Sequence, residues 1–301
     1  MFGDDFWSSI KDNIIEAWYD FCTWIVQQML IYASNTLSDV VEFLRDGITE
    51  TPQSWNPELF ATLQNVTNAA ILPIAIGIMA IILCYDLITA CIDRNNFKDF
   101  DISIFFQFII KAWIAIYLIN NVFTIVGGLF EIGADIADTA LGTVLTEANS
   151  MGDFIASEEF RESLREFNGF DLVLSFWLAL GVFIVSLAMI IIVMVVTAGR
   201  MIEILITISA APIPFATMTN KEWSSVGFSY LKTILALALQ AFFIVITLAI
   251  YIVLFNINIA NAMDNVFGLT EAMIKWLCYG IICCFMLIKT GSIAKSICNA
   301  H

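Results

Sequence analysis

Residues 200–240 decide the fold of this chain and read RMIEILITISAAPIPFATMTNKEWSSVGFSYLKTILALALQ. Two long apolar stretches flank this join, residues 172–198 before it and residues 226–255 after it. Within it, the 14 residues 205–218 carry no charge, whereas a helix needs roughly 20 apolar residues to cross the hydrocarbon of a bilayer. The join is therefore too apolar for an ordinary loop and too short for another complete span.

The two prolines of this join predict a break in the helix that enters it. Pro212 and Pro214 disfavour helical backbone angles at the residue before each, so we predict an extended Pro-x-Pro elbow at residues 211–218. Thr219 and Glu222 have the spacing of a capping box, which predicts that a new helix begins there. Irregular backbone near lipid is tolerated where it is buried in protein or lines a cavity. The alternative is a turn at the membrane surface between two helices.

The composition is that of a membrane protein. Hydrophobic residues make up 60% of the 301 residues, and the mean hydropathy is +0.86. Soluble domains contain about 45–50% apolar residues. We therefore predict an all-α, polytopic membrane protein with about five transmembrane helices.

The formal net charge of −15 is unevenly distributed along the chain. Residues 1–60 and residues 131–171 each carry ten acids and two bases, a net charge of −8, and the remaining residues carry +1. The simplest topology places both acidic segments on one face of the membrane.

We predict four regions along the chain. The first is an acidic N-terminal region with two amphipathic helices, and the second holds spans one and two. The third is an acidic helical segment, and the fourth holds three further spans, the elbow and a tail. In order, these regions are residues 1–68 (helices 6–32 and 37–44, then a linker at 51–57), 69–130, 131–171 and 172–301.

Local signals refine these elements. Asn56, followed by a proline and an acid, predicts a helix start, and Ser157 predicts the start of a short acidic helix. Pro73 predicts a kink in the first span. Asn120 and Asn121, in the middle of the second span, are expected to hydrogen-bond a neighbouring helix.

Orientation follows from the basic residues, because Lys and Arg near span ends favour the cytoplasm. Five spans place three basic sets on one side of the membrane: Arg94 with Lys98, Arg200 with Lys221, and Lys289 with Lys295. Both acidic segments then lie on the other side. We therefore predict an N-terminus outside and a cytoplasmic C-terminus. If the elbow were a sixth span, the tail would lie outside instead.

Six ionisable residues fall toward the cytoplasmic half of the predicted spans: Asp86, Lys111, Arg200, Glu203, Lys232 and Lys289. Intramembrane charges are rare and often functional, so one hypothesis is a polar ring that lines a pore or an ion path. The alternative is structural. Basic side chains then extend to the headgroups, Asp86 pairs with Lys111, and Arg200 pairs with Glu203.

No signature of an enzyme is present in the sequence. There is no phosphate-binding loop and no dinucleotide fingerprint. The seven cysteines have no paired spacing, and the one histidine is His301. We expect no catalytic residues, no metal site and no cofactor.

The plan of the chain resembles the TrbL-like polytopic membrane subunit of conjugative type IV secretion systems. The resemblance rests on the uncharged span 172–198, the outside segment 131–171 and the join, where AAPIPFATMTN (210–220) precedes FSYLKTILALALQ (228–240). It implies a subunit of the bacterial cytoplasmic membrane that forms or surrounds the path of DNA and protein substrates. It also implies other membrane subunits and an ATPase as partners.

A homo-oligomer is expected on physical grounds. A third helix that runs unbroken to Ser209 presents five aliphatic side chains beyond the bilayer: Ile202, Ile204, Leu205, Ile206 and Ile208. Burying each stabilises by roughly 1.5–3 kcal/mol, so neighbouring copies are expected to cover them, with spans three and four at the subunit contacts.

Other functions remain open at this point. One is a stand-alone ion or solute transporter that uses Asp86, Lys111 and Lys232. Transporters commonly show an internal repeat and paired broken helices, whereas this chain has one elbow and no visible repeat. A small pore-forming or lysis protein is disfavoured by the length of the chain and its acidic exterior.

The acidic segments constrain the partners of the chain. A surface of this charge repels DNA phosphates. We therefore expect a positively charged partner to dock on residues 131–171, where four glutamates cluster: Glu158, Glu159, Glu162 and Glu166.

Overall fold

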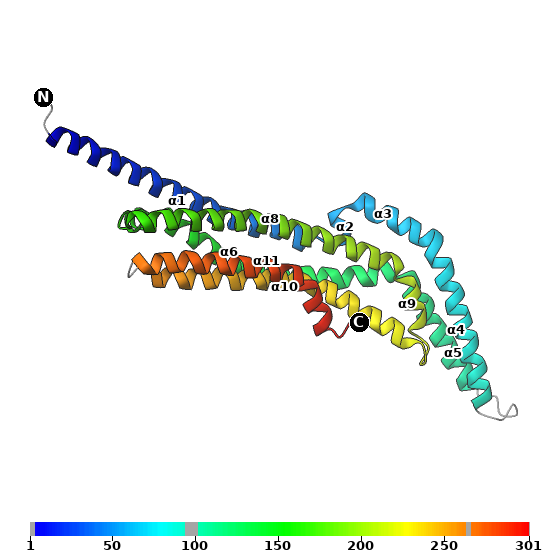
Figure 1. Ribbon diagram of the computed structural model, residues 1–301. Helices are drawn as coiled ribbons and strands as arrows, with labels where there is room; N and C mark the ends of the chain where they lie inside the picture. The colour runs from blue at the N-terminus through cyan, green and yellow to red at the C-terminus, as the bar shows by residue number, and fades with distance from the viewer. Residues whose placement is uncertain (1–3, 94–101, 263–265, 301) are drawn as a thin grey trace. The chain divides into compact units, whose positions relative to one another are not determined.

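The structure is a computed structural model that describes residues 4–93, 102–262 and 266–300 (Figure 1). Every element in these ranges is a helix, which confirms the predicted all-α fold. The elements are α1 (Asp4–Thr49), α2 (Pro52–Trp55), α3 (Pro57–Val66), the π-helix η1 (Thr67–Ile71), α4 (Leu72–Asp93), α5 (Ile102–Asn120), α6 (Val122–Ile155), α7 (Glu158–Arg165), α8 (Gly169–Ala210), α9 (Pro212–Thr217), α10 (Ser224–Ala262) and α11 (Val266–Ile297). The predicted polar loop with Arg94 and Lys98 lies outside the described residues.

Four helical stretches of the described chain are long and apolar enough to cross a membrane: Pro57–Thr89, Gly169–Ala210, Ser224–Ile257 and Gly268–Ile297. A fifth is formed by α5 and α6 if that pair, bent by 65°, counts as one broken span. The chain is thus a polytopic helical membrane protein, and the prediction of about five spans agrees with the upper count.

The second predicted span is not one straight helix. The chain breaks at Asn121, between α5 and α6. The Nδ2 of Asn121 donates to the carbonyl of Tyr117, one turn back, at 2.9 Å, and Asn120 is exposed. The expected hydrogen bond to a neighbouring helix is therefore wrong for Asn121. Its amide satisfies local backbone at the bend, as short polar side chains often do.

The N-terminal region also differs from the prediction, because α1 is one helix of 46 residues rather than two pieces. The polar residues Ser34 and Thr36, between the two predicted helices, are buried within it. Helix α2 occupies the predicted linker and is capped by Thr51. Burial of an apolar face outweighs the weak helix propensity of serine and threonine here.

The helix that leads into the first span begins as predicted. The Oδ1 of Asn56 accepts from the amide of Leu59 at 2.9 Å, and Pro57 is the first helical residue of α3. Just before Pro73, where a kink was predicted, the helix widens into η1, and the amide of Leu72 donates to the carbonyl of Thr67. The wider turn precedes the site where proline would clash with the carbonyl four residues back.

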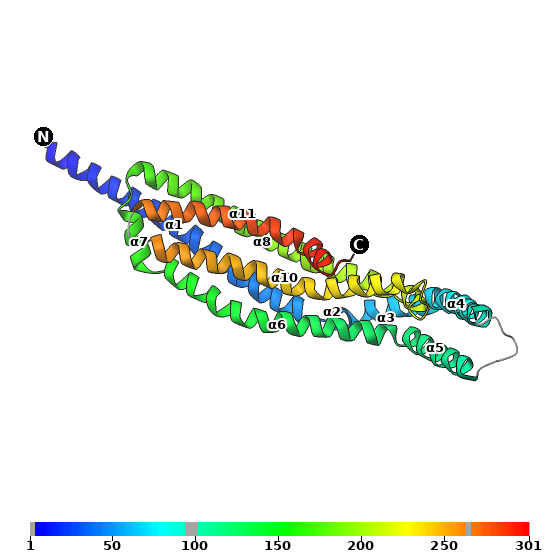
Figure 2. The same cartoon turned by 90° about the horizontal axis from the view of Figure 1, so that it is seen from below.

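The chain forms two compact units. The first contains Met1–Asp46, Asp138–Val196 and Ile244–Lys289. In it α10 and α11 run alongside each other (Figures 1 and 2), joined by a hydrogen bond of 2.7 Å from Trp276 Nε1 to the hydroxyl of Tyr251. Gln27 of α1 donates to the carbonyls of Ile155 and Ser157, which ties α1 to the start of α7. Side-chain and aromatic packing together fix this bundle.

The second unit contains Gly47–Ala137, Thr197–Phe243 and Thr290–His301. Its main core includes Ile204, Leu205 and Ile208 of α8, packed among buried residues of α6, α9 and α10. The chain itself therefore covers three of the five aliphatic residues that were expected to need a neighbouring copy. Only Ile202 and Ile206, 51% and 66% exposed, remain uncovered.

One contact in the second unit joins the first candidate span to the end of the third. The hydroxyl of Thr67 donates to the carbonyl of Ser209 at 3.2 Å. This bond ties η1 to the C-terminal end of α8, next to the elbow.

Candidate functional site

The elbow is a short buried helix rather than extended chain. Ala211 has φ −54° and ψ −36°, and residues 212–217 form α9. The predicted extended Pro-x-Pro conformation is therefore wrong. Pro212 and Pro214 occupy the first turn of α9, where backbone amides have no partner within the helix, so neither ring removes a hydrogen bond. The steric bias before proline is outweighed by packing.

Helix α9 packs against α4 and α5 within the second unit, and the three helices lie side by side in Figure 1. Phe215 is 1% exposed and meets the ring of Tyr230 edge to face. Ala216 packs in a second cluster with buried residues of α4 and α5: Ala75, Met79, Leu83, Ala115 and Ile119. The elbow is therefore buried in protein and is not an exposed turn.

Close approach of the backbone explains Gly227 near the start of α10. A Cβ at this position would lie 2.7 Å from the carbonyl oxygen of Pro214 and 2.3 Å from the side chain of Met218. A larger residue would push α10 away from α9, so glycine is required for this packing.

Asn220, rather than the predicted capping box, holds the turn that leads into α10. Its Oδ1 accepts from the amides of Glu222 and Trp223 at 2.7 and 3.1 Å. The hydroxyl of Thr219 is buried and has no hydrogen-bond partner in the described part of the chain. Asparagine is among the strongest capping residues, so the sequence offered this signal one position after the threonine.

The same Asn220 joins two charged residues of the predicted set. Its Nδ2 donates to Asp86 Oδ1 at 2.5 Å, and Asp86 Oδ2 lies 3.5 Å from Lys111 Nζ. The side chain of Asp86 is 17% exposed and that of Lys111 is 44% exposed. These three residues, from α4, α5 and the turn after α9, are called the elbow cluster below.

The remaining ionisable residues of the set do not join this cluster. The expected pair between Arg200 and Glu203 does not form. Arg200 is buried, and its Nε donates to the carbonyl of Leu237 on α10 at 3.2 Å, while Nη1 has no partner among the described residues. Glu203 pairs with Lys295 of the tail at 2.6 Å. Contacts between helices distant in sequence replace the expected contact within α8.

Lys232 is exposed on α10, and no contact joins it to the elbow cluster in the described ranges. The four glutamates Glu158, Glu159, Glu162 and Glu166 are exposed on or just after α7. Ser157 caps this helix by accepting from the amide of Phe160, while Phe160 and Leu164 are buried beneath it. The helix thus presents its acids outward.

The site offers ion pairing and hydrogen bonding between helices. Among the described residues, no group of three His, Cys, Asp or Glu side chains is placed to hold a metal ion. Asn220 and Lys295 were not among the predicted site residues. The capping preference of asparagine indicates Asn220, whereas no local sequence pattern pairs Lys295 with Glu203.

A protein-family model described as TrbL/VirB6 plasmid conjugal transfer like protein matches residues 37–212, more than half of the chain. The chain belongs to this TrbL/VirB6-like family. The match starts inside α1, covers α8 and ends at Pro212, the first residue of α9. The expected resemblance therefore holds for the first three predicted spans and the acidic segment, while the last two spans, with residues 228–240, lie beyond the match. Comparison with curated proteins and with solved structures gives no match.

Membership of the TrbL/VirB6-like family makes this chain a membrane subunit of the type IV secretion and conjugation class. The region matched includes Asp86, Lys111, Arg200 and Glu203, and also the four exposed glutamates of the acidic segment.

Proposed function

We propose that this TrbL/VirB6-like chain is a channel or scaffold subunit that assembles with copies of itself around the translocation path of a conjugation machine. It works as a structural subunit and not as an enzyme. Its partners are the other membrane subunits, a machine ATPase and lipids, and DNA or protein passes only in transit.

The observation that carries this proposal is the length of α8. Its 42 residues span about 63 Å at 1.5 Å per residue, about twice the 30 Å of a hydrocarbon core. Near its C-terminal end Ile202 and Ile206 are exposed on the isolated chain. Apolar side chains there need cover, which a second copy supplies.

The test is to purify the full chain in lipid nanodiscs, count its copies and identify the proteins that accompany it. The pair of changes Ile202→Ser and Ile206→Ser is expected to dissociate the oligomer. Ile297→Ser, which replaces an equally exposed isoleucine near the end of α11, is the matched control. A monomer in nanodiscs, or an oligomer that both variants leave intact, contradicts this arrangement.

We also propose that the C-terminal tail is cytoplasmic and the N-terminus outside. The basic residues Arg200, Lys221 and Lys295 support this orientation. A reporter inserted after Gln53 is expected in the outer compartment, and reporters inserted before Pro212 and after Lys221 are expected in the cytoplasm. Opposite compartments for the last two would make the elbow a sixth span.

A basic partner in the outer compartment completes the proposal. The exposed carboxylates of Glu158, Glu159, Glu162 and Glu166 are available for it, and charge complementarity speeds association. The transporter alternative has less support, because Lys232 shares no contact with Asp86 and Lys111 in the described structure.

A further inference from the structure

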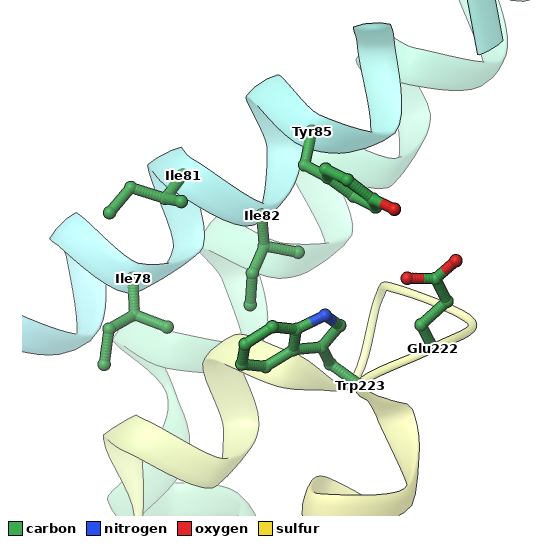
Figure 3. Close-up of a pocket in the computed structure, with 6 residues that line it drawn as sticks. All are labelled: Ile78, Ile81, Ile82, Tyr85, Glu222 and Trp223. Carbon is green, nitrogen blue, oxygen red and sulfur yellow. The ribbon is translucent and has the colours of Figure 1, made fainter. Parts of the chain in front are cut away.

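A cleft of about 390 Å³ lies in the second unit, between α4 and the turn that follows α9 (Figure 3). Four residues of α4 at helical spacing form one wall: Ile78, Ile81, Ile82 and Tyr85. Glu222 and Trp223 form the other. This volume falls in the range of about 300–1,000 Å³ that is usual for small-molecule sites.

The cleft has an apolar body and a polar end. Figure 3 shows the indole of Trp223 beside Ile82, while the carboxylate of Glu222 points toward the end where the hydroxyl of Tyr85 lies. Ile82 is buried and Ile81 is 72% exposed, so one side of the cleft opens to the surroundings of α4. Helix α4 belongs to a stretch apolar enough to span a membrane. The open side is therefore suited to an apolar occupant such as an acyl chain.

Two aromatic residues mark the depth of the cleft. Tryptophan and tyrosine concentrate at the membrane–water boundary, with their rings in the apolar layer and their polar atoms in the headgroup layer. Tyr85 and Trp223 are both about half exposed beside the cleft. This pattern fits a polar end at headgroup level and isoleucines at the level of the acyl chains.

The polar end has a carboxylate, and a cation neighbours it in the chain. Glu222 lines the cleft, and the exposed Lys221, which is not part of the lining, directly precedes it. A phospholipid with an ammonium group carries a phosphate and a cation a few atoms apart, which complements an adjacent lysine and glutamate.

We propose that this cleft binds one glycerophospholipid with a primary ammonium headgroup, such as phosphatidylethanolamine. One acyl chain lies against Ile78, Ile81 and Trp223, the ammonium group donates to Glu222, and the phosphate meets Lys221. A primary ammonium has three hydrogen-bond donors and a choline headgroup has none, so Glu222 selects ethanolamine over choline. The bound lipid would support the packing of α9 and its turn against α4.

The test uses the full chain in nanodiscs that contain photoreactive phospholipids with a diazirine on one acyl chain. Three probes with identical chains carry ethanolamine, choline or glycerol headgroups. After irradiation, mass spectrometry of peptides locates the label. The ethanolamine probe is expected to label residues 78–85 and 223 roughly tenfold more than the choline probe, the ratio that one charge-assisted hydrogen bond provides.

Two variants separate the headgroup from the chain. Glu222→Gln is expected to reduce labelling by the ethanolamine probe to the level of the choline probe. Ile81→Trp, which fills the open side at an exposed position, is expected to reduce labelling by every probe. Glu58→Gln and Ile88→Trp, exposed residues outside the cleft, are the controls and should leave labelling unchanged.

Equal labelling by ethanolamine and choline probes, or a preference that survives Glu222→Gln, would overturn the proposal. Stronger labelling by the glycerol probe would show an anionic lipid held by Lys221 and would also overturn it. Absence of label from the cleft would point to a protein side chain as its occupant. None of these results depends on the copy number of the chain, so the lipid site and the proposed function fail separately.

Discussion

The elbow cluster and the acidic helix α7 use the same carboxylate chemistry in opposite ways. Asp86 contacts Asn220 and Lys111 within its own unit, and its side chain is only 17% exposed. On α7 the carboxylates point outward, and the pair from Glu158 to Arg161 is 3.7 Å long with Glu158 70% exposed. A partly buried acid with partners holds helices together, whereas exposed acids contribute little to folding. Stability should therefore depend on the elbow and partner binding on α7.

The largest effect is expected from Phe215→Ala on α9. The ring is buried in the main core of the second unit, and removal of such a ring costs about 3–5 kcal/mol. Thermal unfolding in detergent measures the loss. Phe228→Ala, which removes a ring that is 56% exposed on α10, should change the melting temperature far less. Similar losses in both variants would show that α9 is not part of a packed core.

A smaller loss is expected from Gly227→Val. The new side chain would meet the carbonyl of Pro214, and overpacking of this kind costs about 1–3 kcal/mol. Gly199→Ala is the control, because nothing lies within 4 Å of a Cβ there, and alanine favours the helix by about 1 kcal/mol. A tolerated valine at position 227 would mean that α9 and α10 separate without cost.

Substitution of Asp86 tests the elbow cluster directly. Asp86→Ala leaves Asn220 without its acceptor and is expected to cost about 1–2 kcal/mol. Asp86→Asn keeps an oxygen for Asn220 and loses only the attraction to Lys111, which is worth about 0–1 kcal/mol for a half-exposed pair. Melting temperatures of the two variants, with Lys111→Ala beside them, separate the two contacts.

The same variants separate a scaffold from a transporter. In a scaffold, folded Asp86→Ala and Lys111→Ala proteins should still assemble and support conjugation. In a transporter they should abolish solute flux in proteoliposomes. Solute flux by the unchanged protein that disappears with Asp86→Asn, without loss of stability, would favour the transporter.

The smallest effect on stability is expected at α7. Glutamine at Glu158, Glu159, Glu162 and Glu166 should leave the melting temperature unchanged, because all four side chains are exposed. Binding of a basic partner should weaken in this variant, and 0.5 M salt should weaken binding to the unchanged protein, because salt screens exposed charges over about 3–10 Å. Co-purification that neither change affects would contradict the electrostatic dock.

Much of the fold could be predicted from local signals. The caps at Asn56 and Ser157 lie where the sequence indicated them, since a cap depends on the two or three residues that follow it. The continuous α1 could not be predicted in the same way. Ser34 and Thr36 suggest a break by propensity, and only their burial against other helices removes it.

The candidate site was less predictable, because its contacts join distant parts of the chain. Arg200 and Glu203 have ideal spacing for a pair, yet each contacts another helix. The pairing of Asp86 with Lys111 was anticipated only because a short acid inside a span needs a cation nearby. The extended conformation predicted from the prolines of α9 is wrong for a related reason. The steric preference of one residue is weaker than the burial of a whole helical turn.

The π-helix η1 absorbs one residue in the helix that leads into α4. A π-turn accommodates one residue more than an α-turn, and each residue of an α-helix advances the chain by about 100°. If the same residues formed α-helix throughout, Asp86 would be rotated by about that angle relative to α3, away from Asn220 and Lys111. The wide turn therefore keeps Asp86 on the face of α4 that meets the elbow, and deletion of one residue from Thr67–Ile71 is expected to convert η1 to α-helix and leave that face unchanged.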